Sequence, residues 1–220
     1  MRLGSMIAFS GMDSSGKSTY INYLKEDLEV KGMRYKVFWS RGGYTPLFEV
    51  IKKSARKILG KSLPESGHSQ KRDEMFKNKT ISNIWFVVAL LDLILWYVFV
   101  FRAYRLVGYV LVCDRYIWDT YIDFSLQYSS SKLKKSLLWT FLEKFSRKPD
   151  LSICFFVTPE VSLNRSEEKK EPFSEKLEKR IDRYGLYNNL SNKWDVVIST
   201  ENASIDNTWE KIRGVLRDAL

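Results

Sequence analysis

A phosphate-binding loop is the most specific chemical motif in the chain. Gly11-Met12-Asp13-Ser14-Ser15-Gly16-Lys17-Ser18 matches G-x-x-x-x-G-K-[ST] in full, between an apolar run and a helical pattern. The glycines let backbone N–H groups turn inward toward phosphate oxygens, and the following helix N-terminus adds partial positive charge. Lys17 is predicted to bind the β- and γ-phosphates of a nucleoside triphosphate, and the Ser18 hydroxyl to bind Mg²⁺. The predicted phosphate-binding residues are Gly11, Ser14, Ser15, Gly16, Lys17, Ser18 and Thr19.

A carboxylate and an arginine follow the third apolar run, in the sequence Asp114-Arg115-Tyr116. If this run is a strand beside the phosphate loop, Asp114 can bind Mg²⁺ directly or through water. The Arg115 guanidinium can bind phosphoryl oxygens through two parallel hydrogen bonds. A salt-bridged strand end would have the same sequence, so this motif alone leaves both interpretations open.

A charged segment separates two helical patterns later in the chain. It runs Glu167-Glu168-Lys169-Lys170-Glu171-Pro172, with Arg165 just before it. Charge runs are often only solvated surface. Cations here could instead form a lid, over about residues 164–174, that closes on the transferring phosphoryl group and excludes water. A kinase needs this exclusion because water would otherwise accept the phosphoryl group. The candidate lid cations are Arg165, Lys169 and Lys170.

One further motif points to a different class, the GTPase switches. Asn192-Lys193-Trp194-Asp195 spells N-K-x-D, which reads guanine in that class. There the motif follows a buried strand, whereas here it precedes one, and no D-x-x-G follows the third strand. We therefore interpret the match as chance and do not predict a switch.

Short apolar runs alternate with longer helical patterns, which predicts an α/β fold with a parallel sheet and helices on both faces. Ligands in such sheets bind at the carboxyl ends of the strands, where the phosphate loop and Asp114 would meet. The predicted strands are Met6–Ser10, Tyr35–Trp39, Tyr109–Cys113, Leu151–Val157 and Val196–Ser199. The predicted helices are Lys17–Val30, Leu47–Leu59, Asp73–Arg105, Thr120–Tyr128, Leu133–Phe145, Pro159–Lys169, Ser174–Leu190 and Asn207–Ala219.

Composition limits the remaining classes. The chain has 220 residues, 45% hydrophobic and 28% charged, which predicts one folded domain over residues 1–220. The net charge of +10 suits an anionic partner, but the basic residues are dispersed and no nucleic-acid-binding motif is present. Cys113 and Cys154 lie in apolar runs, and no signal-peptide pattern opens the chain, so we expect a reducing, cytoplasmic setting. The single histidine, His68, lies in a polar stretch and argues against a His-based catalytic triad.

The segment Ile84–Phe101 is almost entirely apolar and long enough to span a membrane. Asp92 sits near its centre, where lipid would disfavour a charge. A helix buried in the core or in a homodimer interface explains the pattern with fewer assumptions, although a peripheral membrane contact stays open.

Together these motifs resemble the thymidylate kinase family of nucleoside monophosphate kinases over nearly the whole chain. The resemblance implies a P-loop NTPase fold with a five-stranded parallel sheet and a short lid, ATP and Mg²⁺ as cofactors, and often a dimer formed through long helices. It also implies that Arg41 and Arg115 bind the acceptor phosphate and that Asp13 lies near the acceptor. Some members carry a catalytic arginine inside the phosphate loop, where this chain has Ser14, so lid cations would have to serve. The similar stretches are Phe9 to Thr19, Arg41 with Thr45-Pro46-Leu47, Asp114-Arg115-Tyr116, Pro149-Asp150-Leu151 and Arg165.

Two stretches depart from the family pattern. The family usually has a base-reading arginine on the long helix, and the matching stretch here, Val87-Val88-Ala89-Leu90-Leu91-Asp92, lacks it. After Asp-Arg-Tyr this chain has Trp118-Asp119-Thr120-Tyr121-Ile122-Asp123-Phe124 instead of small residues followed by Tyr-Gln. A lost donor leaves a base carbonyl unpaired at a cost of about 1–3 kcal/mol. Asp92, Asp119 and Asp123 could accept hydrogen bonds from hydroxyls or an amine, or could be helix caps or surface groups.

The combined expectation is a phosphotransferase that moves the γ-phosphoryl group of ATP to a small-molecule acceptor, with dTMP preferred and dTDP as product. Two alternatives stay open: a related kinase for another nucleotide or a hydroxylated sugar-like metabolite, and a regulatory or membrane-associated nucleotide-binding protein with little turnover. The candidate catalytic residues are Lys17, Asp13, Arg115 and Arg165, and the candidate metal ligands are Ser18 and Asp114. The candidate acceptor-binding residues are Asp13, Arg41, Asp92, Arg115, Asp119 and Asp123.

Overall fold

The computed structural model describes residues 3–40, 78–128, 130–170 and 174–220. The predicted helix Leu47–Leu59, the Thr45-Pro46-Leu47 stretch, Arg41 and His68 lie outside these described residues.

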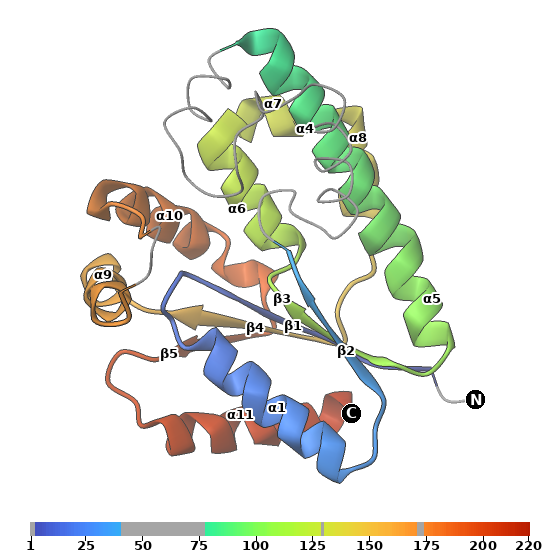
Figure 1. The fold of residues 1–220 in the computed structure, drawn as a ribbon, viewed down its shortest axis with the longest axis vertical. Helices are drawn as coiled ribbons and strands as arrows, with labels where there is room; N and C mark the ends of the chain where they lie inside the picture. Colours follow the sequence, from blue (N-terminus) through green and yellow to red (C-terminus); the bar gives the residue numbers. More distant parts are fainter. Residues whose placement is uncertain (1–2, 41–77, 129, 171–173) are drawn as a thin grey trace.

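A five-stranded parallel sheet with strand order β2-β3-β1-β4-β5 forms the centre of the molecule (Figure 1). Every predicted strand is confirmed to within one residue at each end. The strands are β1 (Met6–Gly11), β2 (Tyr35–Trp39), β3 (Val110–Asp114), β4 (Leu151–Phe156) and β5 (Val196–Ser199). In the sheet β1 lies between β3 and β4 and runs parallel to both, so the carboxyl ends of these three strands lie side by side.

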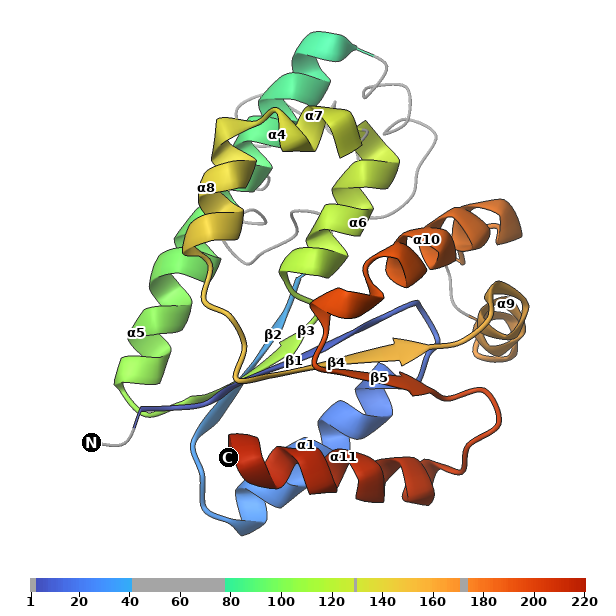
Figure 2. The ribbon, with the colours of Figure 1, turned by 180° about the vertical axis from the view of Figure 1, so that it is seen from behind.

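Alternate residues of β1 enter two different cores. Ile7 and Phe9 pack under α1 (Lys17–Val30) and α11 (Ile205–Ala219) on one face of the sheet. Met6 and Ala8 pack on the other face, against α6 (Ile117–Tyr128), α8 (Leu137–Phe145) and the long helix described below. Figure 2 shows the two helical layers from behind, with α1 and α11 together on one side. The period of two along a buried strand thus produces the predicted three-layer α/β arrangement.

The long helix predicted over Asp73–Arg105 begins six residues later, at Lys79, where the Asn78 side chain caps it, and it ends at Leu106. It consists of α4 (Lys79–Ile94), a π-helical stretch η2 (Leu95–Val100) and α5 (Phe101–Leu106). By length and composition this helix could cross a membrane, and 44% of its most apolar window is buried inside the protein. Leu90 and Leu93 are wholly buried, whereas Ile84 and Phe99 are more than half exposed. One side of the helix therefore packs into the core, and apolar side chains on its other side are exposed.

The remaining helices show where local signals changed the predicted boundaries. The predicted helix Leu133–Phe145 is broken into α7 (Ser130–Lys134) and α8, because Ser136 takes an extended conformation and caps Trp139 N at 3.3 Å. Helix α9 (Pro159–Glu168) begins at a proline, as predicted. Helix α10 (Leu177–Asn189) begins three residues later than predicted, and the short 3₁₀ turn η3 (Ser191–Lys193) follows it.

Candidate active site at the phosphate loop

Two glycines allow the phosphate loop to follow its path from β1 to α1. Gly11 has φ of 133°, and a Cβ atom there would lie 2.3 Å from the Phe155 carbonyl oxygen of the neighbouring strand. Gly16 has φ of 89° and occupies the N-cap position of α1. Ser14 also takes a positive φ, of 55°, which non-glycine residues rarely adopt. The loop therefore has the left-handed turns that direct backbone N–H groups toward an anion.

Lys17 is folded back into this loop. Its Nζ atom donates to Gly11 O at 3.0 Å, to Met12 O at 2.5 Å and to Ser15 Oγ at 3.3 Å. The side chain is buried, and this burial, followed by the neighbouring Arg115 charge, lowers the pKa of the Lys17 ammonium to about 8. An ammonium that is held this close to losing its proton is a strong site for a phosphate, because added negative charge stabilises the protonated form.

Asp13 and Arg115 meet across the loop. The Arg115 Nη2 atom donates to Asp13 Oδ1 at 2.5 Å, and its Nη1 atom donates to the Tyr187 hydroxyl at 3.0 Å. Arg115 is 3% exposed and has φ of 73°, so the backbone turns sharply as β3 ends. Arg115, which is predicted to bind the acceptor phosphate, and Asp13, which is predicted to lie near the acceptor, are thus neighbours in the structure.

Asp114 precedes Arg115 at the end of β3. Its Oδ1 atom is buried and has no hydrogen-bond partner among the described residues. Burial raises the pKa of the Asp114 carboxyl, while Lys17 and Arg115 act against this rise. A buried carboxylate oxygen without a donor, beside the phosphate loop, suits a divalent cation.

Asp119 has a structural position rather than one facing an acceptor. The side chain is fully buried, and its carboxylate accepts from Ser10 Oγ, Gly11 N, Tyr116 N and the Tyr187 hydroxyl. These donors come from β1, the start of α6 and α10. Asp119 therefore fixes the beginning of the phosphate loop against α6, which corrects the expectation that it binds the acceptor.

Asp123 likewise takes part in a buried ion network. It accepts from Arg183 Nη1 at 2.5 Å, and Arg183 also forms two hydrogen bonds with the Glu175 carboxylate, at 2.9 and 3.0 Å. This network joins α6 to α10 and to the segment before α10. Arg183 matches the charge of Asp123 through Oδ1, whereas the buried Oδ2 atom has no hydrogen-bond partner among the described residues, so the acceptor role of Asp123 stays a prediction.

Arg180, which sequence analysis did not single out, connects the segment after the lid to the loop. It is 1% exposed, donates to the Glu175 carbonyl at 2.9 Å, and also donates to Ser162 Oγ. The Ser162 hydroxyl donates in turn to the Asp13 carbonyl at 2.8 Å. In the sequence Arg180 and Arg183 stand in an ordinary charged helix, and only their spacing of three residues, which puts them on one helix face, hinted at a shared role.

Arg165 does not face the phosphate loop opening. Its guanidinium donates to the Thr200 carbonyl at 2.8 Å and to Thr200 Oγ1 at 3.3 Å, and Thr200 Oγ1 donates to Ser15 O at 3.0 Å. In this structure Arg165 holds the loop after β5 against the phosphate loop, and its role as a catalytic lid cation stays a prediction. Lys169 and Lys170 lie at the exposed end of α9, where the lid was predicted.

Two further candidates and the N-K-x-D segment remain. Asp92 is 3% exposed within the long helix. Arg41 lies outside the described residues. Asp195 of the N-K-x-D segment accepts from Ser152 N at 2.8 Å and Ser152 Oγ at 2.6 Å, so it fixes β4 rather than reading a base beside the loop.

A parallel sheet with a phosphate loop between its central strand and the next helix defines a P-loop NTPase, and acidic and basic side chains meet here at the carboxyl ends of β1 and β3. No protein-family model matches the chain. The chain is 30% identical over 177 residues to the probable thymidylate kinase of Archaeoglobus fulgidus, covering 79% of this chain and 75% of that protein. The chain belongs to the thymidylate kinase family.

Further similarities extend over different parts of the chain. The thymidylate kinase of Caldicellulosiruptor saccharolyticus is 27% identical over 231 residues, covering 99% of this chain and 98% of that protein. The probable thymidylate kinase 2 of Saccharolobus solfataricus is 25% identical over 169 residues, and the match spans 76% of this chain and 66% of that relative. The fold is similar to the solved thymidylate kinase of Candida albicans, with a TM-score of 0.62 and 18% identity over 98% of this chain and 92% of that one.

Proposed function

We propose that this protein is an ATP-dependent kinase that transfers the γ-phosphoryl group to a nucleoside monophosphate, with dTMP as the acceptor and dTDP as the product. The observation that carries the proposal is the meeting of Lys17, Asp13 and Arg115 beyond the carboxyl ends of β1 and β3. Lys17 lies within the loop and would bind the donor phosphates. Arg115 lies beside the loop and would bind an acceptor phosphate. The curated relatives named thymidylate kinase support dTMP as the acceptor.

The chemistry needs little covalent participation from the protein. Phosphoryl transfer passes through a loose transition state, so positioning and charge neutralisation dominate. Lys17 leaves the loop carbonyl oxygens and binds the β- and γ-phosphates. Arg115 exchanges Asp13 for the acceptor phosphate, and Asp13 is then close enough to orient the acceptor. Lys169 and Lys170 supply further positive charge when the lid closes.

The residues present also fit a magnesium ion. Among the described residues no three acidic, histidine or cysteine side chains gather as a metal cluster. Mg²⁺ in kinases does not need such a cluster, since one carboxylate, a hydroxyl, substrate phosphates and waters complete its six ligands. Asp114, with its unpaired buried oxygen, and Ser18, at the start of α1, would hold the ion. The ion would supply Lewis-acid neutralisation of the phosphate charge.

A second acceptor class is favoured by one observation. In the family pattern, the base-reading arginine of the long helix follows an aspartate that Asp92 matches. The residue after Asp92 here is Leu93, which is wholly buried in the apolar core, so this position supplies no cation to a base. The same kinase chemistry could therefore act on another nucleotide or on a hydroxylated sugar-like metabolite. We further propose that residues 1–220 form one kinase domain in the cytoplasm, and that the outward apolar side of the long helix supports a homodimer.

The test is ADP release from ATP and Mg²⁺ with a panel of acceptors: dTMP, dUMP, the other nucleoside monophosphates and a set of sugars. Each reaction is run in parallel with Lys17→Ala, which removes the loop cation and reveals any contaminating kinase. Turnover with dTMP that Lys17→Ala abolishes supports the proposal. Turnover only with a sugar would replace the nucleotide acceptor. ATP binding without turnover on any acceptor would contradict the kinase assignment.

A further inference from the structure

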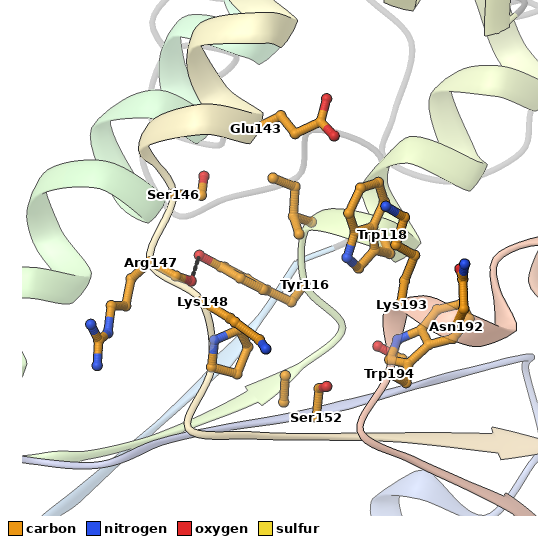
Figure 3. Close-up of a pocket in the computed structure, with 14 residues that line it drawn as sticks. Tyr116, Trp118, Glu143, Ser146, Arg147, Lys148, Ser152, Asn192, Lys193 and Trp194 are labelled. Carbon is orange, nitrogen blue, oxygen red and sulfur yellow. Dashed lines mark hydrogen bonds between the residues drawn. The ribbon is translucent and has the colours of Figure 1, made fainter.

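A cavity of about 280 Å³ lies on the α6 and α8 side of the sheet (Figure 3). It opens between the start of α6, the connection from α8 to β4, and η3. Its described lining includes Ser10 of β1 but no residue of the phosphate loop, Gly11–Ser18. It also includes neither Asp114 nor Arg115. The cavity is therefore separate from the candidate active site. The residues that give it chemical character are Tyr116, Trp118, Glu143, Lys148, Lys193 and Trp194.

Aromatic rings form two sides of this cavity. Figure 3 shows Tyr116 on one side and Trp118 and Trp194 on the other. Trp194 is 7% exposed and stacks on Tyr187, with ring centroids 5.6 Å apart. Aromatic walls held by the core favour a flat, unsaturated ligand, because such a ring can stack without losing much conformational freedom.

Two lysines bring positive charge to the same space. Lys193 Nζ lies 4.7 Å from the Trp118 ring centroid, and Figure 3 shows Lys148 extending toward Trp194. Lys148 also lies 3.9 Å from Asp195, at the long end of an ion pair between exposed groups. Glu143 is the one acidic residue in the described lining, so the cations outnumber it. The N-K-x-D segment, which had no role at the phosphate loop, supplies both Lys193 and Trp194.

The floor of the cavity is fixed by hydrogen bonds to the rest of the protein. Ser10 Oγ donates to Asp119 at 2.6 Å, and Ser152 Oγ donates to Asp195 at 2.6 Å. The Tyr116 hydroxyl donates to the Arg147 carbonyl at 2.8 Å. A cavity with its polar groups already held in place loses little entropy when a ligand enters.

We propose that this cavity is a second binding site, for a small aromatic anion consisting of one planar ring and one negatively charged substituent. Cavities for drug-sized ligands span roughly 300–1,000 Å³, so this volume suits a single ring rather than a whole nucleotide. The ring stacks between Tyr116 and the two tryptophans. The negative charge lies between the Lys148 and Lys193 ammonium groups.

The experiment is a ligand-observed NMR titration of the full chain with three matched probes. Benzoate has both ring and charge, benzamide keeps the ring without the charge, and cyclohexanecarboxylate keeps the charge without a planar ring. Benzoate is expected to bind most tightly. Equal affinities for benzoate and benzamide, or for benzoate and cyclohexanecarboxylate, would overturn the proposal.

Variants locate the binding on the protein. Lys148→Gln combined with Lys193→Gln removes the two exposed lysine charges, keeps the third lining cation, Arg147, and should weaken benzoate binding about fivefold, as expected for solvated charge pairs. Lys211→Gln, an exposed lysine on α11 beyond the other face of the sheet, should leave benzoate affinity unchanged. Saturating inorganic pyrophosphate should fill the phosphate loop without displacing benzoate. Unchanged affinity in the double variant, or displacement by pyrophosphate, would place the probe elsewhere and contradict the proposal.

Discussion

Asp13 and Arg115 form an ion pair at 2.5 Å that joins the phosphate loop to the residue after β3. The pair brings together residues about a hundred positions apart in the chain and leaves the Asp13 side chain 20% exposed. Arg115 is also 3.6 Å from Asp119, which is fully buried. Arg115 is thus held by two protein carboxylates, and the acceptor phosphate that we propose it binds would have to compete with them.

Arg115→Lys tests this role while keeping the positive charge. Lysine cannot reproduce the two-pronged geometry of the guanidinium, so kcat/KM for the acceptor should fall by about 100-fold. ATP affinity should change by less than about threefold, because Lys17 and the loop hold the donor. Steady-state kinetics and calorimetric ATP titration measure the two effects. Arg213→Lys, which changes a half-exposed arginine in the same way, is the matched control. If Arg115→Lys weakened ATP affinity as much as it lowered kcat/KM for the acceptor, the acceptor role would be refuted.

The lowered pKa of Lys17, about 8, predicts pH-dependent ATP binding. Only the protonated ammonium binds phosphates, and its fraction in the free protein falls as pH rises through 8. The Kd for ATP should therefore rise by about tenfold between pH 7 and pH 9, and binding should take up a proton in this range. Titration calorimetry in buffers of different ionisation enthalpy measures that uptake.

Lys17→Arg provides the control for this pH dependence, because a guanidinium stays protonated through pH 9. Its ATP affinity should be lower overall but flat between pH 7 and pH 9. A wild-type Kd that is equally flat would show that Lys17 keeps an ordinary pKa in the free protein.

Asp119→Asn should reduce stability more than catalysis. The asparagine amide nitrogen cannot accept hydrogen bonds, so buried donors among Ser10, Gly11 and Tyr187 lose their acceptor at a cost of about 1–3 kcal/mol. Chemical denaturation of the variant measures the loss, and Asp182→Asn, exposed on α10, is the control. An unchanged free energy of unfolding, together with a raised KM for the acceptor, would restore the original acceptor assignment.

The fold and the phosphate loop could be predicted from the sequence because their signals are local. Strands such as Leu151–Phe156 are apolar except at one position, Ser152, and the loop needs glycines at fixed positions beside a lysine. The roles of Asp119, Asp123 and Arg165 depend on partners from distant segments, such as Tyr187, Arg183 and Thr200. A buried carboxylate matched by an internal arginine and one facing a substrate look the same in a sequence.

The Arg183 network allows a direct comparison of buried and exposed ion pairs. Arg183→Leu removes the cation that pairs with the buried carboxylates of Asp123 and Glu175, and the free energy of unfolding should fall by about 3–5 kcal/mol. Arg213→Leu removes the partner of Asp27 in an exposed pair and should change stability little. Parallel urea denaturation of both variants makes the measurement, and similar losses for the two would contradict a buried network.

The exposed lysines at the end of α9 distinguish a kinase from a nucleotide-binding protein with little turnover. Lys169→Ala combined with Lys170→Ala should lower kcat by at least about tenfold, because the lid then lacks cations to neutralise the transferring group. ATP affinity should change little, since the phosphate loop supplies most donor contacts. Lys134→Ala combined with Lys135→Ala, at exposed positions next to α8, removes the same charge away from the site. If ATP affinity falls and phosphoryl transfer does not, these lysines hold the nucleotide only, and another cation must stabilise the transfer.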